Sequence, residues 1–239
     1  MLVKLSAFII ILVFSCTLFA QTSIKWGPKV GLNLAMQYGT KGQDQGISVK
    51  TKLHPGVMAG AYLDLVVIPN FSLSYELLYS MKGSKETITI NSMEIDGVLE
   101  NLPKPAVMNV QYNLDYIELP VLLKVKLIDA KAFSLTAISG TAVSIKVKGS
   151  HKLDGKIYLP EGDDFSTINI HEESNLGDVN MFDYSFVYGG TVDLKTKLPL
   201  HLEYRFTLGW DYLSLPTYQF SDPVQLRNQT YSLGLSLGF

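Results

Sequence analysis

Residues 26–36 read WGPKVGLNLAM, and apolar side chains alternate strictly with small or polar ones along this stretch. One set comprises Trp26, Pro28, Val30, Leu32, Leu34 and Met36, and the other comprises Gly27, Lys29, Gly31, Asn33 and Ala35. A period of two residues is that of a β-strand, because successive side chains point to opposite faces. The stretch therefore predicts a strand with one apolar face.

The same alternation returns along the rest of the chain. Residues 71–80, FSLSYELLYS, and residues 231–239, YSLGLSLGF, both place aromatic or leucine side chains opposite serine, glycine or glutamate. Segments of this kind, about ten residues long, are typical of transmembrane β-barrels. The complete set comprises residues 26–36, 57–67, 71–80, 114–127, 132–147, 182–194, 200–208 and 231–239. The sequence therefore predicts eight strands.

The connections between these segments alternate in length. Tight turns are expected near residues 68–70, 128–131 and 195–197. Long connections rich in polar residues, glycine and proline are expected at residues 37–55, 82–113, 148–181 and 210–228. Short periplasmic turns and longer outer loops are the layout of outer-membrane barrels, and this layout places both termini on the periplasmic side.

The rival interpretation is a soluble eight-stranded barrel whose apolar face points inwards around a ligand. An eight-stranded barrel has an interior only wide enough for side chains or one small ligand, whereas the apolar face here carries most of the aromatic and leucine residues. We therefore predict an all-β fold, an eight-stranded antiparallel up-and-down transmembrane β-barrel with a filled lumen.

Aromatic residues fall where two interfacial girdles would need them. The periplasmic girdle is predicted to contain Trp26, Phe71, Phe133 and Phe239. The outer girdle is predicted to contain Tyr38, Tyr79, Tyr116, Tyr184, Trp210 and Tyr231.

The N-terminus is typical of a secretory signal peptide. Lys4 precedes an apolar run over residues 5–14, and Ala20 followed by Gln21 supplies a cleavage site. We expect residues 1–20 to be the signal peptide and residues 21–239 the barrel domain. The only cysteine, Cys16, lies in this leader, where lipidation is an alternative that the bulky Phe14 argues against.

Composition excludes some classes of partner. The net charge of -2 and the absence of a long basic run give no electrostatic case for nucleic acid. Charged residues make up 18% of the chain, which is low for a soluble domain. The acidic stretches 161–164 and 171–173 lack the spacing of a calcium-binding loop, so we expect no cofactor and no metal.

Three stretches resemble the porin-family outer-membrane β-barrel domain of Bacteroidota, the group that includes PorT-like proteins. They are residues 27–33 (GPKVGLN), 114–124 (LDYIELPVLLK) and 231–239. The resemblance covers essentially all of the chain after residue 20, and it implies a barrel in the bacterial outer membrane, surrounded by outer-membrane lipid. The alternating end at Phe239 resembles the signal that the barrel-assembly machinery recognises. Family membership implies little about activity, because one fold hosts many functions.

The face opposite the lipid carries charges of both signs. We expect these side chains to form a polar network in the lumen, because a buried charge without a partner is costly. The residues of this network are Lys29, Glu76, Glu118, Lys124, His201, Glu203 and Arg205, with Asp64, Lys126, Asp183 and Asp193 on the same face.

Three functions remain open from the sequence. The first is a non-enzymatic barrel that anchors outer loops for binding, or an envelope or secretion accessory with other envelope proteins as partners. The second is a narrow passive pore. The third is a lipid-modifying enzyme using His201, but the sequence places no particular serine beside this histidine.

Overall fold

The computed structural model describes residues 23–40, 46–95, 98–161, 164–176, 180–213 and 225–239. The predicted leader, residues 1–20, lies outside the described residues. Within the described ranges no helix is long and apolar enough to cross a bilayer. The strands are β1 (Ser23–Thr40), β2 (Ile47–Lys52), β3 (His54–Ile68), β4 (Phe71–Ile95), β5 (Val98–Asp129), β6 (Phe133–Glu161), β7 (Asp164–Asn175), β8 (Phe182–Leu194), β9 (Leu200–Gly209) and β10 (Gln225–Leu237).

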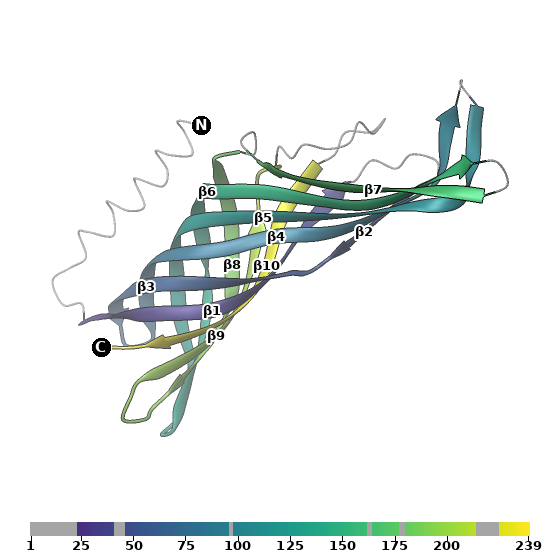
Figure 1. Cartoon of the computed structure of the whole chain (residues 1–239). Helices are drawn as coiled ribbons and strands as arrows, with labels where there is room; N and C mark the ends of the chain where they lie inside the picture. Colours follow the sequence, from purple (N-terminus) through teal and green to yellow (C-terminus); the bar gives the residue numbers. More distant parts are fainter. Residues whose placement is uncertain (1–22, 41–45, 96–97, 162–163, 177–179, 214–224) are drawn as a thin grey trace.

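Eight of these strands form a closed ring. Its order is β1, β3, β4, β5, β6, β8, β9 and β10, each paired antiparallel with the next, and β10 pairs with β1 to complete the ring (Figure 1). The seam is held at its end by Phe239, whose N–H donates to Trp26 O over 2.9 Å and whose ring lies 5.6 Å from the Trp26 ring. The predicted eight-stranded antiparallel barrel is confirmed.

The predicted faces of the strands are confirmed as well. On β1, Leu32 is 63% exposed on the outside, while Lys29 and Asn33 are buried inside. On β10, Leu233 is 62% exposed and Ser232 is buried. An exterior of leucine, valine and aromatic side chains suits lipid, whereas the small side chains fit the narrow interior.

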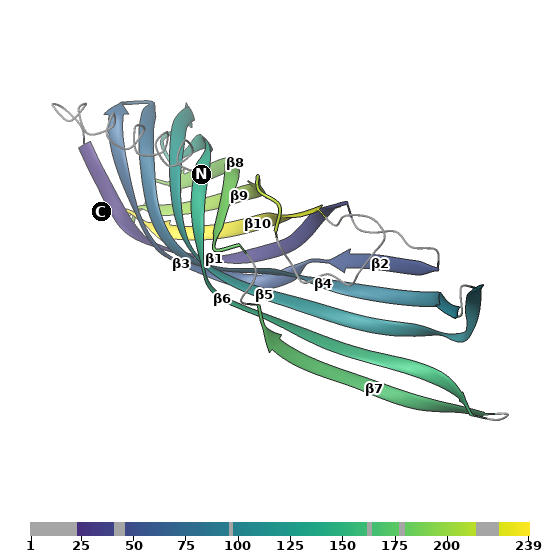
Figure 2. The ribbon, with the colours of Figure 1, turned by 90° about the horizontal axis from the view of Figure 1, so that it is seen from above.

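The wall of the barrel is much taller on one side than on the other. Strands β4, β5 and β6 continue far beyond β8, β9 and β10, and β2 and β7 flank them (Figures 1 and 2). The result is a five-stranded sheet, β2-β4-β5-β6-β7, which we call the outer sheet. β4 and β5 stay paired as far as Ile95 and Val98, and β6 and β7 as far as Glu161 and Asp164.

The outer sheet corrects the prediction of long irregular connections. Residues 82–113 and 148–175 are strand wherever the structure describes them, and β2 occupies part of the connection predicted at 37–55. The reason is a second run of period-two alternation, as in Thr87-Ile88-Thr89 and Met108-Asn109-Val110-Gln111. The polar residues, glycine and proline in these stretches are typical of loops, but the hydrogen-bond ladder continues through them.

One face of the outer sheet carries a packed apolar cluster. Its inward side chains form a buried cluster above the lumen with leucines from the ends of other strands. The members of this cluster are Ile88, Met108, Val110, Tyr112, Leu114, Tyr116, Leu153, Leu176, Leu213 and Leu226. Tyr116 is 0% exposed, so its predicted place in the outer aromatic girdle was wrong. It lies on the inward face of β5, two residues from Glu118.

Candidate functional site

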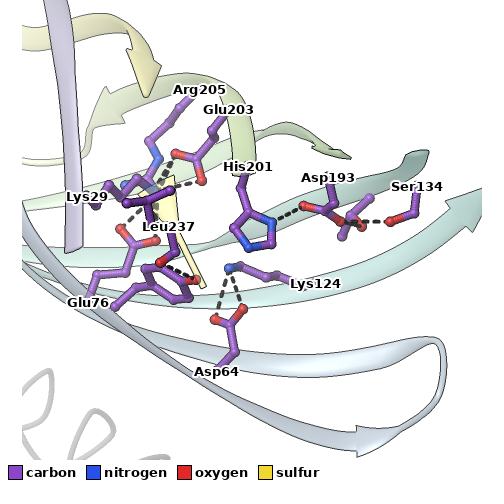
Figure 3. Close-up of polar contacts among 12 residues, drawn as sticks. Lys29, Asp64, Glu76, Lys124, Ser134, Asp193, His201, Glu203, Arg205 and Leu237 are labelled. Atoms are coloured by element: carbon purple, nitrogen blue, oxygen red, sulfur yellow. Dashed lines mark hydrogen bonds and ion pairs between the residues drawn. The ribbon is translucent and has the colours of Figure 1, made fainter. Parts of the chain in front are cut away.

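Four charged side chains cross the middle of the lumen and bind one another. Lys29 Nζ lies 3.0 Å from Glu76 Oε1 and 2.7 Å from Glu203 Oε1. Arg205 Nη2 lies 2.9 Å from Glu76 Oε2 and 2.8 Å from Glu203 Oε1. All four are buried, and they come from β1, β4 and β9 (Figure 3). Two cations and two carboxylates therefore cross-link the wall as one closed cluster, which we call the central cluster.

Glycines opposite the charged residues make room for this cluster. In the register of the sheet, Lys29 lies opposite Gly60, and Arg205 lies opposite Gly189. A Cβ at Gly189 would lie 2.1 Å from the Tyr204 carbonyl oxygen, so no larger residue fits there without a shift of the backbone. The small residues on this face thus provide the space that the long charged side chains fill.

A second ion pair lies above the central cluster. Lys82 of β4 pairs with Glu118 of β5, and Ser144 Oγ donates to Glu118 Oε1 over 3.2 Å. The Lys82 ammonium also lies 5.2 Å from the centroid of the Tyr116 ring. Sequence reasoning missed Lys82 because it placed residues 82–113 in a loop. The signal was present, since Lys82 continues the inward series of Glu76, Leu78 and Ser80.

Asp183 is the other buried carboxylate at this level. It accepts a hydrogen bond from Asn228 Nδ2 over 2.8 Å, and the same amide nitrogen lies 3.3 Å from the Tyr116 hydroxyl. The hydrogen-bond donor to this carboxylate is therefore a neutral amide from β10. Above it lies the apolar cluster of the outer sheet, together with buried polar side chains such as Ser84, whose Oγ donates to Gln37 Oε1 over 2.6 Å.

The end of the lumen nearest the short turns holds two further polar pairs (Figure 3). Lys124 Nζ lies 2.9 Å from Asp64 Oδ2, and His201 Nδ1 lies 2.7 Å from Asp193 Oδ1. Asp193 also accepts hydrogen bonds from Ser134 and Thr136. These pairs line a polar cavity of about 100 Å³ that ends at the central cluster. Ser236 of β10 lies opposite His201 in the register, a neighbour that sequence alone did not identify.

The rim at this end is charged. Lys126, which we predicted in the lumen network, lies half-buried at the rim with its Nζ 3.3 Å from Asp129 Oδ2. Lys195 from the next turn also pairs with Asp129. Hydrogen bonds from Lys195 and Lys126 hold the pKa of the Asp129 carboxyl below its usual value. The aspartate thus joins two of the short turns at this end of the barrel.

The outward face of the outer sheet is polar. Across it run Thr87, Asn109 and Gln111, with Thr87 Oγ1 donating to Asn109 Oδ1 over 3.1 Å. Towards β7 the residues are charged, with Lys152 Nζ 2.9 Å from Glu173 Oε2 and an Asp154–His171 contact of 2.6 Å. A groove of about 620 Å³ lies on β5, β6 and β7, and its lining includes Val107, Asn109, Asp154, Lys156, Tyr158 and His171.

Metal-binding chemistry finds little support in these contacts. Across the described ranges, no group of three or more histidine, cysteine, aspartate or glutamate side chains is arranged to hold a metal ion. The predicted acidic stretch at 171–173 lies on β7, where His171 and Glu173 instead contact Asp154 and Lys152 of the neighbouring strand.

Comparison with known structures gives barrels of the outer membrane at low identity. The chain is similar to Ail, the attachment invasion locus protein of Yersinia pestis, with 9% identity, a TM-score of 0.37, and coverage of 90% of this chain and 98% of that one. It is also similar to Neisserial surface protein A, with 10% identity, a TM-score of 0.40, and coverage of 90% of this chain and 97% of that one. For the outer membrane protease OmpT from Escherichia coli, the identity is 9%, the TM-score is 0.41, and the coverage is 91% of this chain and 97% of that one.

The three proteins are named as an attachment invasion protein, a surface protein and a protease. At identities this low, the similarity says nothing about the activity of this chain. No match was found among curated proteins. A family model described as "Outer membrane protein beta-barrel domain" matches residues 19–210, which is most of the chain. Together with the closed ring of eight antiparallel strands, this match establishes that the chain belongs to the outer membrane protein β-barrel domain family.

Proposed function

We propose that this protein is a non-conducting, non-enzymatic barrel of the outer membrane that presents the outer sheet as a binding platform at the cell surface. In this role it acts as an envelope accessory, of the kind that the resemblance to PorT-like proteins of Bacteroidota suggests. The observation that carries the proposal is the continuity of β4, β5 and β6 from the barrel wall into the outer sheet.

That continuity supports a platform rather than a flexible loop. A strand that is anchored in the barrel and paired on both sides cannot move without breaking a ladder of backbone hydrogen bonds. The buried apolar cluster on the inward face stiffens the sheet further, since Ile88, Val110 and Leu153 are all nearly inaccessible. The polar outward face and its groove are therefore held in a fixed position for contact with a partner.

The contents of the lumen support a closed barrel. The central cluster joins β1, β4 and β9, and the Lys82–Glu118 pair blocks the level above it. An eight-stranded barrel leaves little space beyond its own side chains. A passive pore would require these ion pairs to separate, which makes the pore the weaker of the two non-enzymatic functions.

Photo-crosslinking in native membranes tests the binding role. We would place benzoyl-phenylalanine at Asn109, on the outward face, and at Leu235, on the lipid-facing side of β10, as the matched control. The proposal expects a protein adduct from Asn109 and none from Leu235. Absence of any adduct from Asn109 and from Gln111, in cells grown with the rest of the envelope intact, would contradict it.

One observation favours an enzyme as the second candidate. Asp193, His201 and Ser236 face one another across β8, β9 and β10, and His201 Nδ1 is hydrogen-bonded to Asp193. A carboxylate-oriented imidazole beside a serine is the arrangement of serine hydrolases. A fluorophosphonate probe decides the matter: we expect no labelling of the wild type, whereas labelling that Ser236→Ala abolishes would establish the enzyme.

A further inference from the structure

The two edges of the outer sheet are built differently. β2 forms one edge and pairs with β4, and β7 forms the other and pairs with β6. β2 has 6 residues and carries Lys50 and Lys52, both exposed. Short length and lysine are two of the devices by which proteins prevent a free edge from pairing with another strand.

β7 has neither device. It has 12 residues, contains no lysine, arginine or proline, and pairs with β6 without a shift of register. Strands of five or six residues are the commonest length in globular proteins, so this edge is unusually long and regular. In both views β7 lies at the margin of the sheet (Figures 1 and 2).

The direction of its free hydrogen-bonding groups follows from one contact. The N–H of Leu176 donates to Gly149 O over 3.0 Å, and these two residues continue the β6–β7 register. In an antiparallel pair, residues that exchange hydrogen bonds with the partner alternate with residues that point away from it. The backbone groups of Thr167, Asn169 and His171 therefore point away from β6, to the side on which no strand of the described ranges pairs with β7. We call this side the free edge.

The exposed carboxylates at this edge favour a positively charged partner strand. Glu172 and Glu173 are adjacent, so they lie on opposite faces, and both are exposed. An added strand with cationic side chains on both faces would meet a carboxylate on each. β7 itself carries no lysine or arginine that would oppose it. Its His171 contacts Asp154 of β6, and Lys152 of β6 contacts Glu173.

We propose that β7 is a docking edge for an extended, lysine- or arginine-rich segment of another envelope protein, which adds to the outer sheet as a sixth strand. The inference rests on the proposed binding function and names its partner class. Backbone hydrogen bonds to the free edge supply affinity, and the two glutamates supply selectivity for a basic strand.

Binding of a probe peptide to the folded protein in detergent tests this docking edge. The probe is a fluorescent peptide of about ten alternating threonine and lysine residues, a typical strand length. Asn169→Ala should bind like the wild type, whereas Asn169→Pro, which blocks the free edge while sparing the ladder to β6, should bind about tenfold more weakly. Glu172→Lys with Glu173→Lys should also weaken binding and reduce its dependence on salt.

The same peptide with every backbone amide N-methylated keeps its charge but cannot pair as a strand, so it should not bind. Equal binding of the Asn169→Pro and Asn169→Ala variants, or of the methylated and parent peptides, would overturn the proposal. If Asn169→Pro fails to fold, the comparison of the methylated and parent peptides on the wild-type protein tests the proposal by itself. A dimer of the protein that Asn169→Pro abolishes would make a second copy the occupant instead, which also overturns it. An Asn109 adduct obtained alongside such a failure would leave the broader binding function standing.

Discussion

Replacement of Arg205 by methionine should destabilise the barrel strongly. Arg205 is 3% exposed and contacts both Glu76 and Glu203 at 2.8 to 2.9 Å. Methionine keeps much of the side-chain volume but removes the positive charge. Two buried carboxylates would then share Lys29 as the one remaining cation of the central cluster.

The magnitude follows from these distances. At an effective dielectric constant of 20, two unit charges about 3 Å apart attract by about 5 kcal/mol, and desolvation of the pair offsets much of this attraction. Removal of one partner leaves the desolvation cost without the attraction. We therefore expect the free energy of unfolding to fall by about 3–5 kcal/mol.

Urea unfolding in lipid vesicles, followed by the fluorescence of Trp26 and Trp210, measures this loss. The double variant Arg205→Met with Glu76→Gln removes one charge of each sign, so it should be more stable than Arg205→Met alone, with a coupling energy of about 1 kcal/mol or more. Lys131→Met, at an exposed position in a short turn at the rim of the barrel, is the control and should change stability by less than about 0.5 kcal/mol.

A loss below about 1 kcal/mol in Arg205→Met would refute the reasoning, because it would mean that water solvates the carboxylates once the arginine is gone. Additive effects of Arg205→Met and Glu76→Gln on the free energy of unfolding would also refute the reasoning. They would show that Arg205 and Glu76 do not interact in the folded barrel, whatever their distance.

Three further predictions concern the membrane and the lumen. Leu235→Arg should lower the stability of the folded barrel by about 2–4 kcal/mol, because it places a cation in lipid. Heat-modifiability on gels should then show a lower yield of folded barrel, and an unchanged yield would reverse the assignment of faces. Planar bilayers containing the wild type should show no stable channel, and a large steady conductance would restore the pore as first candidate. Protease added to intact cells should cut the connections between β4 and β5 or between β6 and β7 and spare the turn at Asp129, whereas cleavage confined to that turn would invert the topology.

The sequence alone determined the faces of the strands and hence the barrel. Residues such as Leu32 and Lys29 were assigned correctly because a period of two is local, and no knowledge of a neighbouring strand is needed to read it. The count of barrel strands followed from the same pattern. Errors arose where the pattern ran on into residues that resemble a loop, as at Lys82 and in the outer sheet.

Only the tertiary structure decided which charges meet and where the sheet ends. The Lys29–Glu203 contact joins residues 174 positions apart, and it depends on the register of β1, β10 and β9. A slip of one residue in any pair would turn a side chain from the lumen to the lipid, and period-two alternation in a single strand does not specify its partner's register. The free edge of β7 likewise follows from strand order. Whether a strand lies at an edge depends on which other strands pair with it, and the sequence of that strand alone does not show this.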